Sequence, residues 1–165
     1  MKKLCFTAMI ATLMLCILGC TSKQSDQLTQ QQKEQITKEV KIVMDSIFAK
    51  FGRLDVVGAL EYYSSELLVV GDKSIMPYQS TKENWIEAFG SMTTVKWTPV
   101  QWECIPLTKD LVISTWIGKM EFMMKSGDKG ICDPQGYTDV LKKVDGQWKS
   151  IYEHASGTPV MQATE

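Results

Sequence analysis

Acidic and aromatic side chains recur together in this chain, and they are the residues best suited to do chemistry. A carboxylate enclosed by apolar walls can serve as a general base, and a phenol beside it can donate a hydrogen bond to a developing oxyanion. The same groups could instead be hydrogen-bonded structural residues. The candidates are Asp139 or Glu103 as the base, Tyr137 or Tyr62 as the donor, and Trp116 or Trp85 as the apolar wall.

The second half of the chain must form the strands that position most of these groups. From Lys96 onward, β-branched and aromatic residues alternate with polar ones, and turn residues interrupt the pattern. Short connections make the strands consecutive antiparallel neighbours. The predicted strands cover residues 97–106, 111–124, 131–143 and 148–156.

The predicted pairing of these strands separates two faces. Pairing across the turns sets Glu103 opposite Ser114 and Trp116 opposite Asp139, and opposite side chains share a face. The face predicted to line a pocket carries Gln101, Glu103, Ile105, Ser114, Trp116, Gly118, Met120, Tyr137, Asp139 and Leu141. The other face, predicted to form an interface between subunits, carries Trp102, Cys104, Ile113, Thr115, Ile117, Thr138 and Val140.

The last predicted strand can meet the pocket in either of two ways. If Asp145 and Gly146 form a two-residue turn, one set of alternate side chains joins the face of Asp139, and if Val144 is part of the loop, the other set does. One residue of slip exchanges every side chain between the faces. The first set is Trp148, Ser150, Tyr152 and His154, and the second is Lys149, Ile151, Glu153 and Ala155.

Helices are predicted ahead of the strands. Apolar residues at spacings of three and four indicate a helix that ends near Gly52, and Ser80 with Glu83 forms a possible capping box for a later one. Helices first and strands afterwards predict an α+β, cone-shaped fold whose N-terminal helices pack on a curved antiparallel sheet. The elements predicted here are helices over residues 36–51, 54–64 and 80–90 and a strand over 67–70.

The first residues predict where in the cell the protein is located. Lys2 and Lys3 precede an apolar run that ends in Ile17-Leu18-Gly19-Cys20, which resembles the lipobox of bacterial lipoproteins. We therefore expect residues 1–19 to be a signal peptide, Cys20 to carry lipid that anchors the chain in a membrane, and residues 20–32 to be a polar tether to a domain over 33–160. Since no aspartate follows Cys20, sorting in two-membrane bacteria favours the outer membrane of the cell envelope, facing the periplasm.

Composition excludes several classes of partner. The formal net charge is −1 with no basic block, so nucleic acid is not an expected partner. His154 is the only histidine, which leaves no usual zinc site, and no cofactor motif is present. The predicted pairing places Cys104 and Cys132 too far apart along the strands for a disulfide.

The end of the chain resembles a known family. The motif is Asp145-Gly146-Gln147-Trp148 followed by Ile151, Tyr152, His154, Ser156, Gly157 and Pro159. It is similar to the ending of the association domain of calcium/calmodulin-dependent protein kinase II, and the order of elements from about Gln31 to Pro159 resembles the nuclear-transport-factor-2-like superfamily. The resemblance implies a cone of helices over a bent sheet and an oligomer, a homodimer or larger. It also favours the alternative that places Glu153 in the pocket.

The predicted pocket departs from that association domain in charge. Its basic pocket positions would fall on Asp139, on Ala155 and near Gly118, and none of these is basic here. A pocket that holds Glu103, Asp139 and, in the second alternative for the last strand, Glu153 as its charged groups would therefore prefer a small neutral or cationic ligand. The predicted ligand-binding residues are Tyr62, Trp85, Glu103, Trp116, Tyr137, Asp139 and Glu153.

Function is less constrained than fold, because the superfamily includes isomerases, dehydratases, polyketide cyclases and plain binding or assembly modules. The leading interpretation is an envelope lipoprotein with a small-molecule-binding or assembly domain and no catalytic residue assigned. One alternative is an enzyme of the isomerase, dehydratase or cyclase type that uses a pocket carboxylate, with Asp139 and Glu103 as candidates. The other is a purely oligomeric scaffold.

Overall fold

The computed structural model describes residues 27–71 and 74–162. The expected signal peptide over residues 1–19, Cys20 and the tether up to residue 26 lie outside the described residues. In the two described ranges, no helix combines the length and the apolar character needed to cross a membrane.

The long first helix, α2 (Gln30–Gly52), begins two residues before the expected end of the tether at residue 32. Thr29 caps it, because the Thr29 hydroxyl accepts from the Gln32 backbone N–H while the Gln32 side chain accepts from the Thr29 N–H. The buried face of α2 is the one predicted from its apolar spacing, and it consists of Ile36, Val40, Met44, Ile47 and Phe51.

The segment after α2 departs more from the sequence prediction. The expected second helix is only α3 (Val56–Leu60), and the chain is extended again in β1 (Tyr63–Val70), before β2 (Ile75–Pro77). The helix α4 (Tyr78–Gly90) begins directly after Pro77, so the predicted capping box of Ser80 and Glu83 is wrong. Pro77 directly precedes the first helical residue, and its ring holds φ at −71°. The helix therefore begins at Tyr78, two residues before the predicted start at Ser80.

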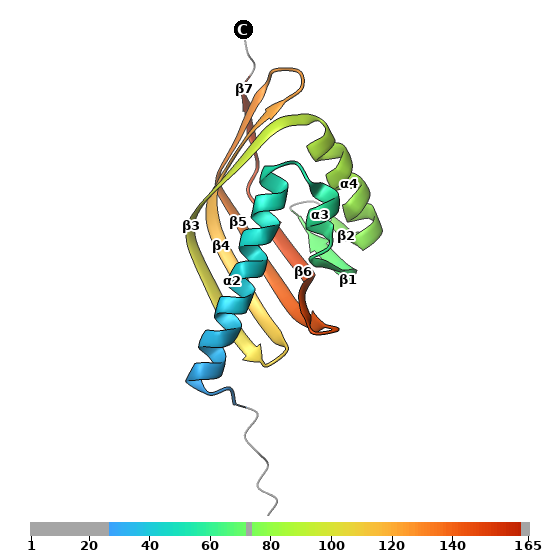
Figure 1. The fold of residues 1–165 in the computed structure, drawn as a ribbon. Coiled ribbons are helices and arrows are strands. Elements are labelled where there is room, and N and C mark those ends of the chain that lie inside the picture. The colour runs from blue at the N-terminus through green and yellow to red at the C-terminus, as the bar shows by residue number, and fades with distance from the viewer. Residues whose placement is uncertain (1–26, 72–73, 163–165) are drawn as a thin grey trace, which may run out of the picture.

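The strands form one curved sheet, and α2 runs in front of it in Figure 1. Its order is β2-β1-β6-β5-β4-β3, with β7 paired to β5, and all neighbours are antiparallel except β1 and β6. The helix α2 crosses one face of this sheet, and α4 covers the same side beside β1 (Figure 1). The predicted α+β cone is therefore confirmed. The bounds of the later strands are β3 (Met92–Thr108), β4 (Leu111–Met124), β5 (Lys129–Val144), β6 (Gln147–Ser156) and β7 (Val160–Gln162).

The predicted pairing of β3 is wrong by one residue. The register shifts between Pro106 and Thr108, and this bulge at Leu107 sets Glu103 opposite Thr115. One residue of slip exchanges the faces, so Trp102 packs inward and its indole Nε1 donates to the Ser114 hydroxyl at 3.0 Å. Glu103 is exposed. The other residues that exchange faces are Gln101 and Ile105, which lie outside, and Cys104, which packs against the core.

The pairing of β4 with β5 differs from the prediction by two residues, which leaves every side chain on its predicted face. Trp116 lies opposite Tyr137, and Ser114 lies opposite Asp139. No disulfide joins Cys104 and Cys132. Their partners on β4 are Ser114 and Met120, so they lie roughly 20 Å apart along the strand direction.

Both alternatives for β6 hold, each over half of the strand. Asp145 and Gly146 have φ of 51° and 79°, as a two-residue primed turn requires, and the half of β6 nearest the turn buries Trp148 and Ser150. A bulge at Ile151 then shifts the register. The outer half of the strand consequently buries Glu153, whose partner is Asp139, and leaves His154 exposed on the opposite face.

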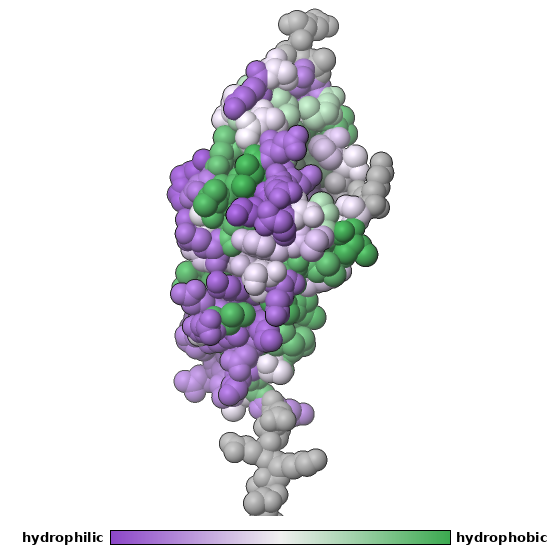
Figure 2. Space-filling view, turned by 90° about the vertical axis from the view of Figure 1, so that its right-hand side faces the viewer, coloured by the Kyte–Doolittle hydropathy of each residue, from purple (hydrophilic) through white to green (hydrophobic). Residues whose placement is uncertain are grey.

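The core fills the space between the helices and the inner face of the sheet. It is built from α2, α3, β1 and the inward residues of β4 to β6. On the side of the molecule that carries α4, hydrophilic surface separates several hydrophobic patches (Figure 2). Exposed apolar residues on elements of this side are Val57, Ile75 and Ile86.

Candidate functional site

A cavity of about 160 Å³ lies between α2, α4 and the inner face of the sheet. A closed apolar cavity of about 150 Å³ is large enough to bind benzene, so this one has room for a molecule of about one ring. The cavity is therefore a site for a small ligand. The aromatic residues that form most of its wall are Phe48, Phe51, Tyr63, Trp85, Phe89, Trp97, Trp116 and Tyr137.

The aromatic wall is held by ring-to-ring contacts. Trp116 and Tyr137 are cross-strand partners whose rings stack with centroids 4.7 Å apart and planes 12° apart. The Phe48 ring meets the Trp116 ring edge-on at 4.6 Å, and Trp97 meets Tyr137 edge-on at 5.9 Å. Such contacts add to the stabilisation from burial and fix the orientation of each ring. The wall is thus formed by packing that does not depend on a ligand.

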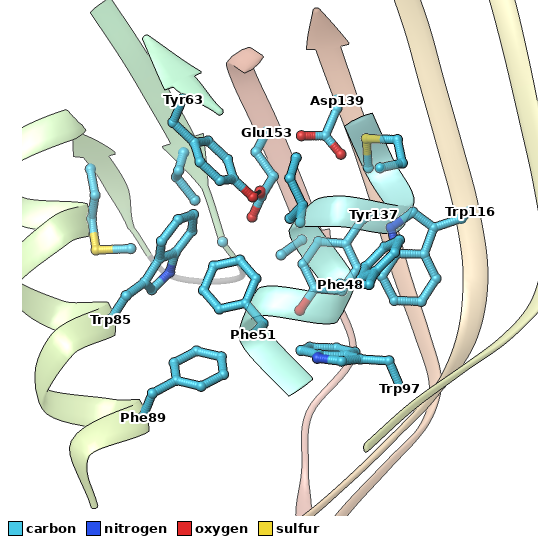
Figure 3. Close-up of a pocket in the computed structure, with 16 residues that line it drawn as sticks. Phe48, Phe51, Tyr63, Trp85, Phe89, Trp97, Trp116, Tyr137, Asp139 and Glu153 are labelled. Carbon is cyan, nitrogen blue, oxygen red and sulfur yellow. Dashed lines mark hydrogen bonds between the residues drawn. The ribbon is translucent and has the colours of Figure 1, made fainter. Parts of the chain in front are cut away.

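Two carboxyl groups meet at one end of the cavity (Figure 3). Asp139 on β5 and Glu153 on β6 are cross-strand partners, and they are only 2% and 4% exposed. The Ser150 hydroxyl donates to Asp139 Oδ1 at 2.9 Å, and the Tyr63 hydroxyl donates to Glu153 Oε2 at 3.2 Å. Two buried acids that share a site with so few donors cannot both be charged without a large cost.

Burial dominates the acid strength of this pair. It raises the pKa of Asp139 to about 7, against the lowering effect of the Ser150 hydrogen bond. Burial also raises the pKa of Glu153 well above its ordinary value, and the charge on Asp139 raises it further. Burial and the nearby acids raise the pKa of Tyr63, so its hydroxyl remains a donor. The pair therefore gains or loses a proton near neutral pH, as general acid–base chemistry requires.

Hydrogen-bond donors lie at the other end of the cavity. Figure 3 shows the Tyr137 hydroxyl and the Trp97 indole nitrogen near Phe51, away from Asp139 and Glu153. Burial raises the pKa of the Tyr137 phenol, which keeps it protonated. Trp97 Nε1 is buried and has no hydrogen-bond partner among the described residues. The cavity thus has an acidic end and a donor end, with aromatic walls between them.

The structure brings five of the seven predicted ligand-binding residues to the cavity wall, namely Trp85, Trp116, Tyr137, Asp139 and Glu153. Tyr62 is half-buried and packs against the core without reaching the cavity. Glu103 lies on the opposite face of the sheet because of the bulge at Leu107.

Two polar groups of the site were not predicted. Tyr63 was expected in a helix over residues 54–64, whereas it is the buried first residue of β1. Trp97 was placed in a strand but given no face, and the register shift between Pro99 and Gln101 sets it opposite Met120, on the inner face. The apolar part of the wall that was also missed consists of Met44, Ile47, Phe48, Phe51, Val69, Met76 and Phe89.

The side chains of the cavity bound the kind of ligand it can hold. Every charged group that lines it is acidic, so the described wall offers no cationic partner for an anion. Among residues 27–71 and 74–162, no three His, Cys, Asp or Glu side chains come together as a metal site would need. The wall is suited instead to a neutral, largely apolar molecule.

Comparison with known proteins shows the fold. Neither a family profile nor a curated protein sequence matches the chain. Among solved structures, one is a candidate scytalone dehydratase from Novosphingobium aromaticivorans, with a TM-score of 0.73 and 12% identity over 83% of this chain and 93% of the other. A type 2 hexachlorocyclohexane dehydrochlorinase has a TM-score of 0.69 and 7% identity over 82% and 94% of the two chains. A ketosteroid isomerase-like protein from Erwinia carotovora atroseptica has a TM-score of 0.62 and 12% identity over 73% and 94%.

These likenesses confirm the predicted resemblance at the level of architecture. The chain has the nuclear-transport-factor-2-like fold, in which helices pack on a curved and mostly antiparallel sheet. At 7–12% identity they say nothing about reaction or ligand, because one fold hosts many activities. Function must therefore be argued from the cavity.

Proposed function

We propose that this protein binds a small neutral molecule of about one ring and moves a proton on it, with Asp139 as the general base. The observation that carries the proposal is the placement of Asp139, a buried carboxyl whose pKa is raised to about 7 and which lines an aromatic cavity opposite hydrogen-bond donors. The proposal adds proton transfer to the binding role that the sequence suggests. Dehydratase and isomerase names among the solved structures with this fold are in keeping with it.

The proton transfer would proceed at a carbon next to a carbonyl group. Ionised Asp139 takes a proton from that carbon, the C–H electron pair forms the C=C bond of an enolate, and the carbonyl π electrons go to its oxygen. Glu153, whose pKa is raised by burial and by the charge on Asp139, keeps its proton in this step and so prevents a second negative charge at this end. Returning the proton from Asp139 to the same or another carbon completes an exchange or an isomerisation, so no other reactant is needed.

Hydrogen–deuterium exchange tests this role without knowledge of the natural substrate. The probes are acetophenone and the more acidic single-ring ketone phenylacetone in D₂O, and NMR follows the loss of the protons next to the carbonyl. We expect the protein to accelerate the exchange above the buffer rate, and the rate to rise with pH through about 7 as Asp139 loses its proton. Asp139→Asn should lower the acceleration by about 100-fold or more.

Glu103→Gln is the matched control, because it also removes one carboxylate but on the outer face of the sheet. It should leave the exchange rate unchanged. A wild-type rate equal to the buffer rate for both ketones, or equal rates in wild type and Asp139→Asn, would leave the cavity as a binding site without proton transfer.

We also propose that the chain acts at a membrane surface as a lipoprotein anchored through Cys20. The lipobox-like residues before Cys20 support this. Metabolic labelling with an alkyne fatty acid in a bacterial host, followed by fractionation, tests it. Wild type should take up label and sediment with membranes, and Cys20→Ser should do neither. An unlabelled wild-type protein released into the soluble fraction would contradict the anchor.

A further inference from the structure

The indole N–H of Trp97 is a buried donor without an acceptor. Trp97 Nε1 is shielded from solvent and has no hydrogen-bond partner among the described residues. A buried polar group left in this way costs free energy, and native structures usually satisfy it with protein, water or a ligand. Since Trp97 lines the cavity, an acceptor placed there would satisfy the indole.

Two other tryptophans, Trp102 and Trp148, show how this donor differs. Trp102 Nε1 donates to the Ser114 hydroxyl at 3.0 Å, and Trp148 Nε1 donates to Glu39 Oε2 at 2.9 Å. Both indoles are therefore satisfied within the protein. Trp97 lies at the end of the cavity where Figure 3 also shows the Tyr137 hydroxyl, so a second donor is close to the first.

We propose that Trp97 and Tyr137 form a subsite for the carbonyl oxygen of a neutral, single-ring ketone or aldehyde, with Trp97 as a binding residue that selects for this acceptor. The inference rests on the proposed function and specifies its substrate class. A carbonyl oxygen has two lone pairs and can accept from both donors at once. An oxygen held at this end points the rest of the molecule toward Asp139 and Glu153 (Figure 3).

The same cavity argues against other acceptors. A carboxylate ligand would bring a charge into a cavity whose charged groups are both acidic, and no basic side chain lines the described wall to compensate it. A hydrocarbon of the same shape would fill the aromatic walls but leave the Trp97 donor unsatisfied. The subsite therefore discriminates in favour of a neutral acceptor, as sites built to form a hydrogen bond do.

A matched pair of probes tests the subsite. Acetophenone has the carbonyl oxygen, and α-methylstyrene has nearly the same planar shape with a methylene group in its place. The protein is labelled with ¹⁵N, and its five tryptophans give at most five indole cross-peaks, each assigned by a Trp→Phe variant. Each probe is titrated while the indole and backbone amide signals are followed.

Acetophenone should shift the Trp97 indole signal downfield as the hydrogen bond forms and leave those of Trp102 and Trp148, which already have acceptors, nearly unmoved. It should bind about tenfold more tightly than α-methylstyrene. Trp97→Phe should reduce that preference about fivefold while leaving the affinity for α-methylstyrene within about twofold, which also shows that the variant folds. Tyr137→Phe should reduce the preference as well.

Three results would overturn the subsite: equal affinities for the two probes, an unchanged preference in Trp97→Phe, or binding of neither probe to the wild type. Proton transfer is judged separately by exchange at Asp139. A carbonyl preference that depends on Trp97 without any exchange would keep the subsite and remove the reaction. Exchange that is indifferent to Trp97→Phe would keep the reaction and remove the subsite.

Discussion

Two carboxyl groups of this protein have pKa values that their different surroundings shift in opposite directions. Glu39 lies on α2, near the surface, and accepts hydrogen bonds from Trp148 Nε1 at 2.9 Å and from the Lys143 ammonium group at 2.9 Å. Hydrogen bonds from Trp148 first, and then from Lys143, lower the pKa of Glu39 to about 2. Asp139 has one hydroxyl donor and no cation, and burial raises its pKa to about 7.

The number and charge of the hydrogen-bond donors, together with the degree of burial, therefore decide which carboxyl group stays ionised in this fold. Glu39 is held as a permanent anion in a contact that joins α2 to β5 and β6. Asp139 sits where its charge is costly, so it can exchange a proton at neutral pH. The contacts of Glu39 stabilise the fold, whereas the burial of Asp139 lowers stability at the site of the proposed chemistry.

The largest effect should come from the pH dependence of the buried pair. Because the pKa of Asp139 rises on folding from about 4 to about 7, the folded state holds a proton that the unfolded chain loses in between. The contribution of Asp139 to the free energy of unfolding is then highest below about pH 4 and falls by about 2–4 kcal/mol as the pH rises to about 7. Urea unfolding at a series of pH values measures this. Asp139→Asn should flatten the fall, and a wild type whose stability is constant over this window would contradict the buried charge.

Trp148→Phe tests the other carboxyl group of the comparison, Glu39. It removes the main donor to Glu39 and leaves a smaller ring in a buried position, so we expect a loss of about 1–2 kcal/mol in the free energy of unfolding. The pKa of Glu39, followed by carboxyl carbon NMR, should rise toward its ordinary value. An unchanged Glu39 pKa would mean that Lys143 and Gln35 sustain the anion without Trp148.

Glu39→Gln should cost about 1 kcal/mol at pH 7, since the contact is partly exposed and solvent weakens it. The sign of its pH dependence is opposite to that of Asp139. A lowered folded-state pKa gives stability that is present above about pH 4.5 and is lost as the pH falls toward about 2. Wild type and variant should therefore converge in acid, and added salt should reduce the difference at pH 7. A difference that persists at pH 2 would assign the effect to packing.

Glu103→Gln should have the smallest effect, within about 0.5 kcal/mol at any pH. Glu103 is exposed on the outer face of β3, opposite Thr115, and no ion pair involves it among the described residues. The same unfolding titration measures it. A larger effect would show that the outer face of the sheet is covered in solution.

The sequence was sufficient for the architecture because its signals are local. The apolar spacing from Ile36 to Phe51 gives α2 its buried face, and the turn at Asp145-Gly146 sets the β5–β6 hairpin. The superfamily resemblance followed from the order of these elements. The predicted side-chain faces were wrong where an extra residue interrupts a strand, because the alternation of apolar and polar residues does not show where a bulge lies.

The candidate site could be predicted where the strands are regular. Trp116, Tyr137 and Asp139 keep the predicted face because a slip of two residues preserves it. Glu103 was lost from the site through the bulge at Leu107. Tyr63 depended on where β1 begins, and that follows from its parallel contact with β6, a pairing between distant parts of the chain.

The bulge at Ile151 lets β6 present Trp148 and Ser150 in one half and Glu153 in the other on the same side of the sheet. In a strand of this kind, a change in length by one residue exchanges the faces of the side chains that follow. Removal of Tyr152, with the earlier pairing kept, would move Glu153 to the outward position opposite Val140 and bring His154 opposite Asp139. A single deletion event would then replace an acid–acid pair by an acid–imidazole pair, so relatives of this chain could acquire a different chemistry without altering the fold.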